Sequence, residues 1–367
     1  MSTQTTEDYV ATRRIGDATV TLINDGVFDA IPLIPWMDAP ADAVRRAVPE
    51  ADASGAIGQS GMIVAHVRIG HASILIDPGV GELDPQAGLV TDLKLRRTPG
   101  VQAGLAAVGI QPEQITHVLI THAHDDHFLG ASVRRDGQYL PRYPQARYVI
   151  GRADWAGNPA REDPDSAVAL HLGALDRLGL LDVVEGDAEI VPGVTMIPAP
   201  GESPGHAIVH VASAGDHFYY LGDLFHHTCE VAHLDWVMTQ RDTPAMIASR
   251  QRLLADAVPR DHGLHPPHLP RLGPHRPHRG GVSLGRCLTR RTASAPPGLT
   301  VRTVLAWSLL ARIGEVRARR DHASGHARDS RTAAITRGAR MSPRFGASRT
   351  RLPFLPMAAP CRGRYRN

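Results

Sequence analysis

The stretch Thr121-His122-Ala123-His124-Asp125-Asp126-His127 decides how the rest of the chain is interpreted. It follows Val118-Leu119-Ile120, a short apolar run typical of a strand that is buried on both faces. A loop at the end of such a strand can direct several short side chains to one point, and imidazole together with carboxylate suits zinc or another divalent metal. Without a metal, these polar groups would repel one another or stay unpaired. The stretch therefore predicts a metal site.

Strand and helix signals alternate on both sides of this stretch, from about residue 18 to residue 258. The helix expected at 243–258 should have Thr243 as its N-cap and Pro244 in its first turn. The other expected helices are 99–109 and 165–178, and the expected strands are 19–23, 62–67, 72–76, 118–120, 148–150, 194–197, 208–211 and 218–221. Such an order indicates a mixed α and β domain.

The pattern HxHxDH after a buried strand resembles the metallo-β-lactamase superfamily of metal-dependent hydrolases. Three further segments occur in the order expected of that family: Ile74-Leu75-Ile76-Asp77-Pro78-Gly79, Pro200-Gly201-Glu202-Ser203-Pro204-Gly205-His206 and Tyr219-Tyr220-Leu221-Gly222-Asp223. The resemblance covers roughly residues 18–258. It implies an α+β fold with four layers in the order αββα, whose C-terminal part would be incomplete in this chain.

The resemblance also implies a ligand set for two divalent metal ions, with zinc as the expected metal. The first ion would be held by His122, His124 and His206, the second by Asp126 and His127, and Asp223 would bridge the two. A hydroxide between the ions would attack the substrate, because metals lower the pKa of bound water to about 7. Asp126 would be the catalytic residue that orients this hydroxide and passes its proton to the leaving group.

Other polar residues near the motifs have two open interpretations. Asp77 either supports a metal-bound histidine or is an ordinary turn residue. His226 and His227, which follow Asp223 closely, either line the pocket or lie on the surface.

The expected function is hydrolysis of a small ester, lactone or related small-molecule substrate. Within the superfamily the chain looks most like the lactone- and organophosphate-hydrolysing group, because of Leu22-Ile23-Asn24-Asp25-Gly26-Val27-Phe28 and the long insert before His206. A di-iron redox protein is the less favoured enzyme class. Flavodiiron proteins usually place a carboxylate between the first two histidines, where this chain has Ala123.

The charge of the chain changes sharply near residue 261. Residues 262–367 contain 21 arginines, no lysine and three acidic residues, a balance of +18, whereas residues 1–261 carry −15. We therefore expect a hydrolase domain over 1–261 and an atypical tail over 262–367, disordered or translated out of frame. A basic tail that binds nucleic acid is the disfavoured alternative, because no recognised nucleic-acid module accompanies it.

The tail also bears on the metal site, because the family normally supplies one more histidine after the last long helix. His265 or His268 would have to provide this seventh ligand, although the residues around them fit poorly. A reading frame shifted by one base over 263–278 is compatible with a sequence like the family's final ligand loop, which favours a frameshift between about Val258 and Gly263. The non-enzyme alternative is thus an inactive or unstable relic of a hydrolase.

The apolar runs, the N-terminal residues and the cysteines bear on where in the cell the protein is located. No apolar run approaches the roughly 20 residues that cross a bilayer, and the N-terminus shows no secretory signal. Three widely spaced cysteines suit a reducing cytoplasm. We expect a cytoplasmic protein without a membrane partner, and a homodimer is compatible with the sequence.

Overall fold

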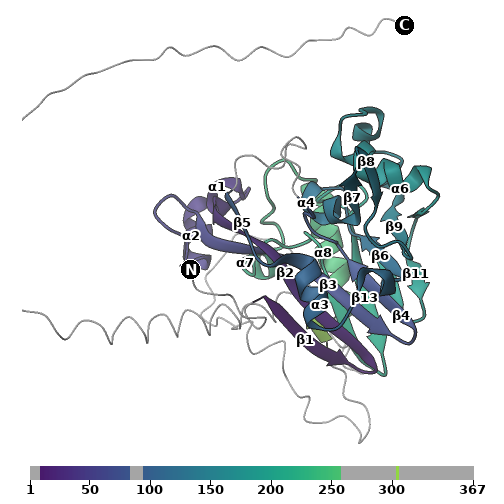
Figure 1. Ribbon diagram of the computed structural model, residues 1–367. Helices are drawn as coiled ribbons and strands as arrows, with labels where there is room; N and C mark the ends of the chain where they lie inside the picture. The colour runs from purple at the N-terminus through teal and green to yellow at the C-terminus, as the bar shows by residue number, and fades with distance from the viewer. Residues whose placement is uncertain (1–8, 83–93, 258–302, 306–367) are drawn as a thin grey trace, which may run out of the picture. The chain divides into compact units, whose positions relative to one another are not determined.

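The computed structural model describes residues 9–82, 94–257 and 303–305, which form two β-sheets with helices around them (Figure 1). The larger sheet has the strand order β1-β2-β3-β4-β6-β9-β10, with β5 paired to β2. Its strands are β1 (Val10–Ile15), β2 (Ala18–Ile31), β3 (Ile57–Ile69), β4 (Ala72–Ile76), β5 (Lys94–Arg97), β6 (His117–Ile120), β9 (Arg147–Gly151) and β10 (Leu181–Val184). The pairs from β1 to β4 are antiparallel, and β4, β6, β9 and β10 run parallel.

The second sheet has the order β11-β12-β13-β14-β15. Its strands are β11 (Ala188–Val191), β12 (Val194–Pro198), β13 (Ala207–Ser213), β14 (Asp216–Tyr220) and β15 (Thr303–Leu305), and a separate hairpin is formed by β7 (Ser132–Arg135) and β8 (Gln138–Pro141). The α-helices are α1 (Leu33–Trp36), α2 (Ala41–Ala47), α3 (Gly100–Ala107), α4 (Asp125–Phe128), α5 (Arg152–Trp155), α6 (Gly173–Arg177), α7 (Cys229–Ala232) and α8 (Thr243–Ala257). The short 3₁₀ turns are Pro112–Gln114, Leu129–Ala131 and Pro159–Glu162, and η5 (Val168–Leu172) is a π-helical turn.

Three apolar cores divide the molecule into four layers. The central core joins the two sheets and includes Ile76 and Leu119 from one sheet and Val209 from the other. The outer face of the larger sheet packs on α3, η5 and α6, and the outer face of the second sheet packs on α8. Since alternate strand residues point to opposite faces, β6 contributes to both cores. The αββα arrangement that the resemblance implies is confirmed.

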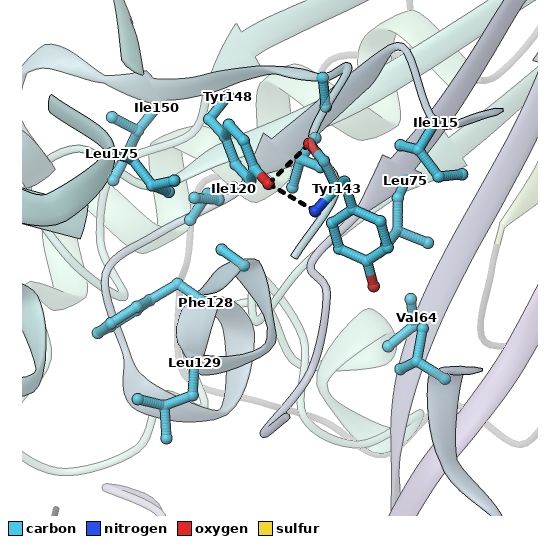
Figure 2. Close-up of a cluster of buried hydrophobic side chains, with 14 of the residues drawn as sticks. Val64, Leu75, Ile115, Ile120, Phe128, Leu129, Tyr143, Tyr148, Ile150 and Leu175 are labelled. Carbon is cyan, nitrogen blue, oxygen red and sulfur yellow. Dashed lines mark hydrogen bonds between the residues drawn. The ribbon is translucent and has the colours of Figure 1, made fainter. Parts of the chain in front are cut away.

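The core on the outer face of the larger sheet fixes the strand that precedes the histidine motif. Figure 2 shows Tyr143 and Tyr148 inside this core, where the Tyr148 hydroxyl accepts from the Tyr143 N–H at 3.0 Å and donates to its carbonyl at 3.2 Å. Ile120 and Phe128, at the two ends of the motif, are fully buried in the same cluster. The motif is therefore enclosed between two anchored apolar residues.

The structure agrees with the expected order of elements and differs in detail. The segment expected as one helix at 165–178 is divided between η5 and α6. Thr243 is the first residue of α8 and not its N-cap, because the Asp242 carboxylate accepts from the Ala245 N–H at 3.0 Å. An acidic side chain with two acceptor oxygens replaces the expected hydroxyl at this cap.

Most of the expected tail lies outside the described residues, as do His265, His268 and the proposed frameshift junction. Thr303–Leu305 is described, and it pairs in parallel with β14 as β15. Internal contacts group the chain into two compact units, Met1–Arg317 and Ala318–Asn367. Every described residue lies in the first unit. The domain boundary at residue 261 stays a prediction. No helix within the described residues is long and apolar enough to cross a membrane.

Candidate metal centre

The histidine motif begins where β6 ends and turns directly into α4. His122 and His127 are buried, whereas the His124 side chain is 40% exposed. His124 precedes α4 with an extended backbone, so its ring turns back toward His122. Nε2 of His122 and Nδ1 of His124 are 2.9 Å apart. Two imidazole nitrogens thus meet at one point, as they must to hold a cation.

The Asp77 carboxylate is hydrogen-bonded to both ends of the histidine motif. One of its oxygens accepts from the Thr121 N–H at 2.8 Å, and the other accepts from the Thr121 hydroxyl at 2.7 Å. The second oxygen also lies 2.8 Å from Nδ1 of His127. When Nδ1 of His127 carries the proton of this bond, Nε2 is the atom free to face a metal. Of the two interpretations of Asp77, the geometry favours support of a ligand histidine.

Asp154 connects the histidine motif to the loop that carries His206. Its carboxylate accepts from the Ala123 N–H at 2.9 Å and from the Ser203 hydroxyl at 2.7 Å. The Gly205 N–H donates to its other oxygen at 2.6 Å. This buried aspartate therefore sets the spacing between two loops that are about 80 residues apart in the chain.

His206 and Asp223 complete the gathering of the six expected ligands. Nδ1 of His206 lies 2.9 Å from the Ala199 carbonyl, to which it donates, and Nε2 lies 3.1 Å from the Asp223 N–H. The Asp223 oxygens lie 3.9 Å from Nε2 of His122 and 3.4 Å from Nε2 of His127. Asp126 approaches Nε2 of His127 at 3.7 Å. Asp223 thus has a histidine on each side, which is the position a bridging carboxylate needs.

The charges of this cluster fit a divalent cation. Burial lowers the pKa of His122 and of His206, which keeps both imidazoles neutral with a lone pair to donate. Burial opposes protonation of His127 as well, but Asp223, Asp126 and Asp77 raise its pKa well above the usual value. The carboxylates therefore place an excess of negative charge at this end of the site, and a metal would neutralise it.

Glu202 is a member of the cluster that sequence analysis missed. Ligand atoms of His122, His124, Glu202 and Asp223 all lie within 4.8 Å of one another. Glu202 belongs to the quoted loop Pro200–His206, but a single glutamate in a loop carries no signal of its own. Its side chain is 1% exposed, and Oε1 lies 3.4 Å from Nδ1 of His124.

The surroundings of Glu202 are charged and come from distant parts of the chain. Arg241 Nη2 lies 2.7 Å from Oε1, and His226 Nε2 lies 3.5 Å from Oε2. Burial acts in the opposite direction, but His226 and Arg241 lower the pKa of Glu202 to about 2. Behind His226, the fully buried Glu230 pairs with the fully buried Arg250. One wall of the site is thus built from ion pairs.

The two histidines after Asp223 separate in the structure. His226 turns toward the cluster, with Nε2 3.8 Å from an Asp223 oxygen. His227 instead pairs with Glu50 at 2.9 Å, and its Nδ1 accepts from the N–H of Cys229, the first residue of α7, at 3.2 Å. His226 therefore lines the site, whereas His227 contacts the segment after α2.

Comparisons with known proteins agree with this geometry. The chain is 31% identical to an N-acyl homoserine lactonase of Bacillus cereus over 102 residues. This matched stretch covers 28% of this chain and 35% of that protein. The chain thus matches about a third of the length of this curated relative. Among solved structures, a probable metal-dependent hydrolase from Staphylococcus aureus has a TM-score of 0.54 at 22% identity, covering 66% of this chain and 86% of that one.

A second solved structure resembles the fold of this chain to a similar extent. AidC, a dizinc quorum-quenching lactonase in complex with a product, has a TM-score of 0.55 at 19% identity, covering 68% of this chain and 86% of that one. The family model of the metallo-beta-lactamase superfamily matches residues 59–280, which include all six expected ligands. With the four layers and the converging histidines, this match shows that the chain belongs to the metallo-beta-lactamase superfamily.

Proposed function

We propose that this protein is a metal-dependent hydrolase of small esters or lactones, with two divalent metal ions and zinc as the expected metal. The proposal is carried by one observation: side chains from separate loops converge on Asp223. One Asp223 oxygen lies 3.9 Å from His122 and the other lies 3.4 Å from His127, while His206 contacts the Asp223 N–H. His124 lies beside His122, and Asp126 lies beside His127. A polar loop without a ligand gives no reason for this convergence.

The bound metals would supply Lewis acidity, which lowers the pKa of water and polarises a carbonyl oxygen. The chain supplies the rest. Asp77 and the Ala199 carbonyl hold the rings of His127 and His206 in a single orientation, so that each presents Nε2. The two Asp223 oxygens approach different histidines, His122 and His127.

Asp126 is the residue we propose to move the proton. Its carboxylate lies 3.7 Å from Nε2 of His127, at the edge of the cluster. A carboxylate beside the attacking water can accept its proton and pass it to the leaving alkoxide. Asp126 is 22% exposed, so a substrate can reach it.

The lactone class is supported by the relatives alone. The partial homologue from Bacillus cereus is an N-acyl homoserine lactonase, and AidC is a lactonase with a bound product. We infer from these likenesses that a lactone is the first substrate to test, followed by aryl esters and phosphotriesters.

The full chain, loaded with zinc, manganese or cobalt, should hydrolyse at least one substrate in a panel of N-acyl homoserine lactones, aryl esters and phosphotriesters. The variant Asp223→Asn should lose about a hundredfold or more in kcat/KM, because the carboxylate shared by both halves of the site is removed. Asp216→Asn, at the start of β14 and away from the cluster, is the matched control: an amide oxygen can still accept from the Gly16 N–H, and full activity is expected. A metal-loaded protein that hydrolyses nothing in the panel would favour the inactive relic.

A further inference from the structure

The carboxylate of Glu202 has a position that its ion pair with Arg241 does not fully explain. Among the described residues, neither Glu202 oxygen has a partner that completes a hydrogen bond of good geometry. An ionised carboxylate offers about four acceptor sites, and Arg241 approaches only Oε1. Leaving acceptor sites unused on a buried carboxylate is costly. This carboxylate is therefore poised for a further electropositive partner.

The backbone fixes where Glu202 points. Gly201 has a φ of +140°, and a Cβ on it would lie 2.5 Å from the Met246 Cα, so the loop presses against the first turns of α8. The Gly201 carbonyl accepts from the Asp242 N–H at 3.0 Å. On the other side, Ser203 and Gly205 are hydrogen-bonded to Asp154. The loop is held at both ends, which places Glu202 beside His124 without depending on the Arg241 pair.

We propose that Glu202 is a ligand of the cation held by His122 and His124, so that this position has two carboxylates, Glu202 and Asp223. The ligand atoms of these four residues lie within 4.8 Å of one another, close enough for one ion to contact all of them after small adjustments. The inference rests on the proposed metal centre. It adds a ligand from this chain's own loop to the set that the resemblance implies.

Arg241 is compatible with this role. Carboxylates that ligate metals are in turn hydrogen-bonded, and such partners orient the ligand. Arg241 Nη2 contacts Oε1, which also lies 3.4 Å from Nδ1 of His124, and His226 Nε2 lies 3.5 Å from Oε2. The contacts with Arg241 and His226 use only part of the acceptor capacity of the carboxylate. The alternative is that Glu202 serves only to neutralise Arg241 and never contacts the metal. The two roles differ in which metals the site prefers.

A second carboxylate changes the balance between metals. Imidazole suits zinc, whereas carboxylate oxygens suit harder ions such as manganese. If Glu202 is a ligand, its loss should weaken manganese binding more than zinc binding. If Glu202 only pairs with Arg241, its loss should weaken both by the same factor. The ratio of the two affinities therefore separates a ligand from a supporting residue.

The test is a competition titration of Zn²⁺ and Mn²⁺ against a chelating dye, performed on the full chain. Glu202→Gln should lower the Mn²⁺ affinity about a hundredfold and the Zn²⁺ affinity about tenfold, a tenfold shift in the ratio. Glu202→Asp keeps the charge with a shorter reach and should shift the ratio in the same direction, which covers the case where Glu202→Gln does not fold. Circular dichroism verifies that each variant is folded.

Glu185→Gln is the control, because Glu185 is also paired with an arginine, Arg152, but lies outside the cluster and the charged wall. It should leave the ratio of affinities unchanged. An unchanged ratio in both Glu202 variants, with two metals still bound to the parent protein, would overturn the inference and leave the proposed function intact. A parent protein that binds no metal would overturn both.

Discussion

The two halves of the metal centre are held in different ways. The histidine loop, residues 121–127, is held by hydrogen bonds from Asp77 and Asp154 to backbone and side-chain groups. The charged wall, formed by Glu202, His226, Glu230, Arg241 and Arg250, is held by ion pairs between residues from separate segments. The first half is built on a strand of the larger sheet, and the second half depends on α8 and the loop before it.

This difference predicts where the site is fragile. In the histidine loop a lost hydrogen bond leaves other bonds in place, because each aspartate makes three. In the charged wall every member is a buried or half-buried charge, so the removal of one partner leaves the other without compensation. We therefore expect mutations of Glu230 and Arg250 to affect mainly folding and mutations in the histidine loop to affect mainly metal binding.

The largest effect is expected for Arg250→Met. Arg250 is fully buried and donates to the carbonyls of Leu224, Leu234 and Trp236 in addition to pairing with Glu230. Its loss leaves a buried glutamate and three carbonyls without their donor, which should lower the free energy of unfolding by about 3–5 kcal/mol. Urea denaturation followed by circular dichroism measures this difference.

The double variant Arg250→Met, Glu230→Gln tests whether the buried charge is the cause. Removing the charge from both partners should recover part of the lost stability, although the three carbonyls remain unsatisfied. Arg252→Met, which breaks an exposed pair with Asp187, is the control and should change stability by less than about 1 kcal/mol. If Arg250→Met is as stable as the parent, the charged wall does not depend on this pair.

The histidine loop can be read from the sequence, whereas the charged wall cannot. The loop is a contiguous pattern after a buried strand, and the resemblance implies His206 and Asp223. The six side chains lie near one another in the structure, and their role as metal ligands stays a prediction. Glu202 and Arg241 lie 39 positions apart, and only the packing of α8 brings them together. Nothing in either local sequence indicates such a pair, because isolated charges are normally exposed.

The secondary structure that differs from the expectation also has local physical causes. Eight strands of the two sheets were recognised, because their apolar residues are continuous or alternate: β2, β3, β4, β6, β9, β12, β13 and β14. The strands β1, β5, β10, β11 and β15 of the same sheets were not predicted. The hairpin of β7 and β8 was missed, since β7 reads Ser-Val-Arg-Arg and its exposed arginines hide the pattern. The segment 165–178, expected as one helix, is divided into η5 and α6, and His171 of η5 contacts Ser132 and Tyr139, which are remote in sequence.

In the histidine loop, Asp77→Asn should weaken metal binding more than folding. Asp77 has a φ of +53°, a conformation that asparagine adopts readily, so the backbone is not strained by the change. The amide loses the charge that orients His127 and one of the acceptors of Thr121. We expect a 10- to 100-fold loss of zinc affinity by dye competition. Equal zinc affinities in the variant and the parent would show that Asp77 is only a turn residue.

We also expect the free energy of unfolding to depend on pH because of His66, a buried histidine of the larger sheet. Burial lowers the pKa of His66 to about 4, with Arg68 as the second cause, and its Nε2 lies 2.8 Å from the Ser73 hydroxyl. The unfolded chain, with a histidine pKa near 6.5, binds more protons between these values, so stability is full above about pH 6.5 and is lost as the pH falls toward 4.

Between pH 7 and pH 5 the loss due to His66 should be about 2 kcal/mol. His66→Gln retains a polar group beside Ser73 and does not titrate in this range. Urea unfolding at both values should therefore show a smaller pH dependence in the variant, while other titrating groups cancel in the comparison. The same slope in both proteins would mean that His66 is not kept neutral by burial.

The smallest effect is expected where the two halves of the site are joined. Ser203→Ala removes one of the three hydrogen bonds to Asp154, at 2.7 Å, while those from Ala123 and Gly205 remain. The expected cost is about 1 kcal/mol in unfolding free energy. Metal affinity should change less than threefold, because Gly205 still fixes the loop next to His206. Asp154→Ala removes all three bonds and should reduce metal affinity far more. Similar losses in the two variants would mean that the Ser203 bond, and not the shared carboxylate, connects the histidine loop to the loop that carries Glu202.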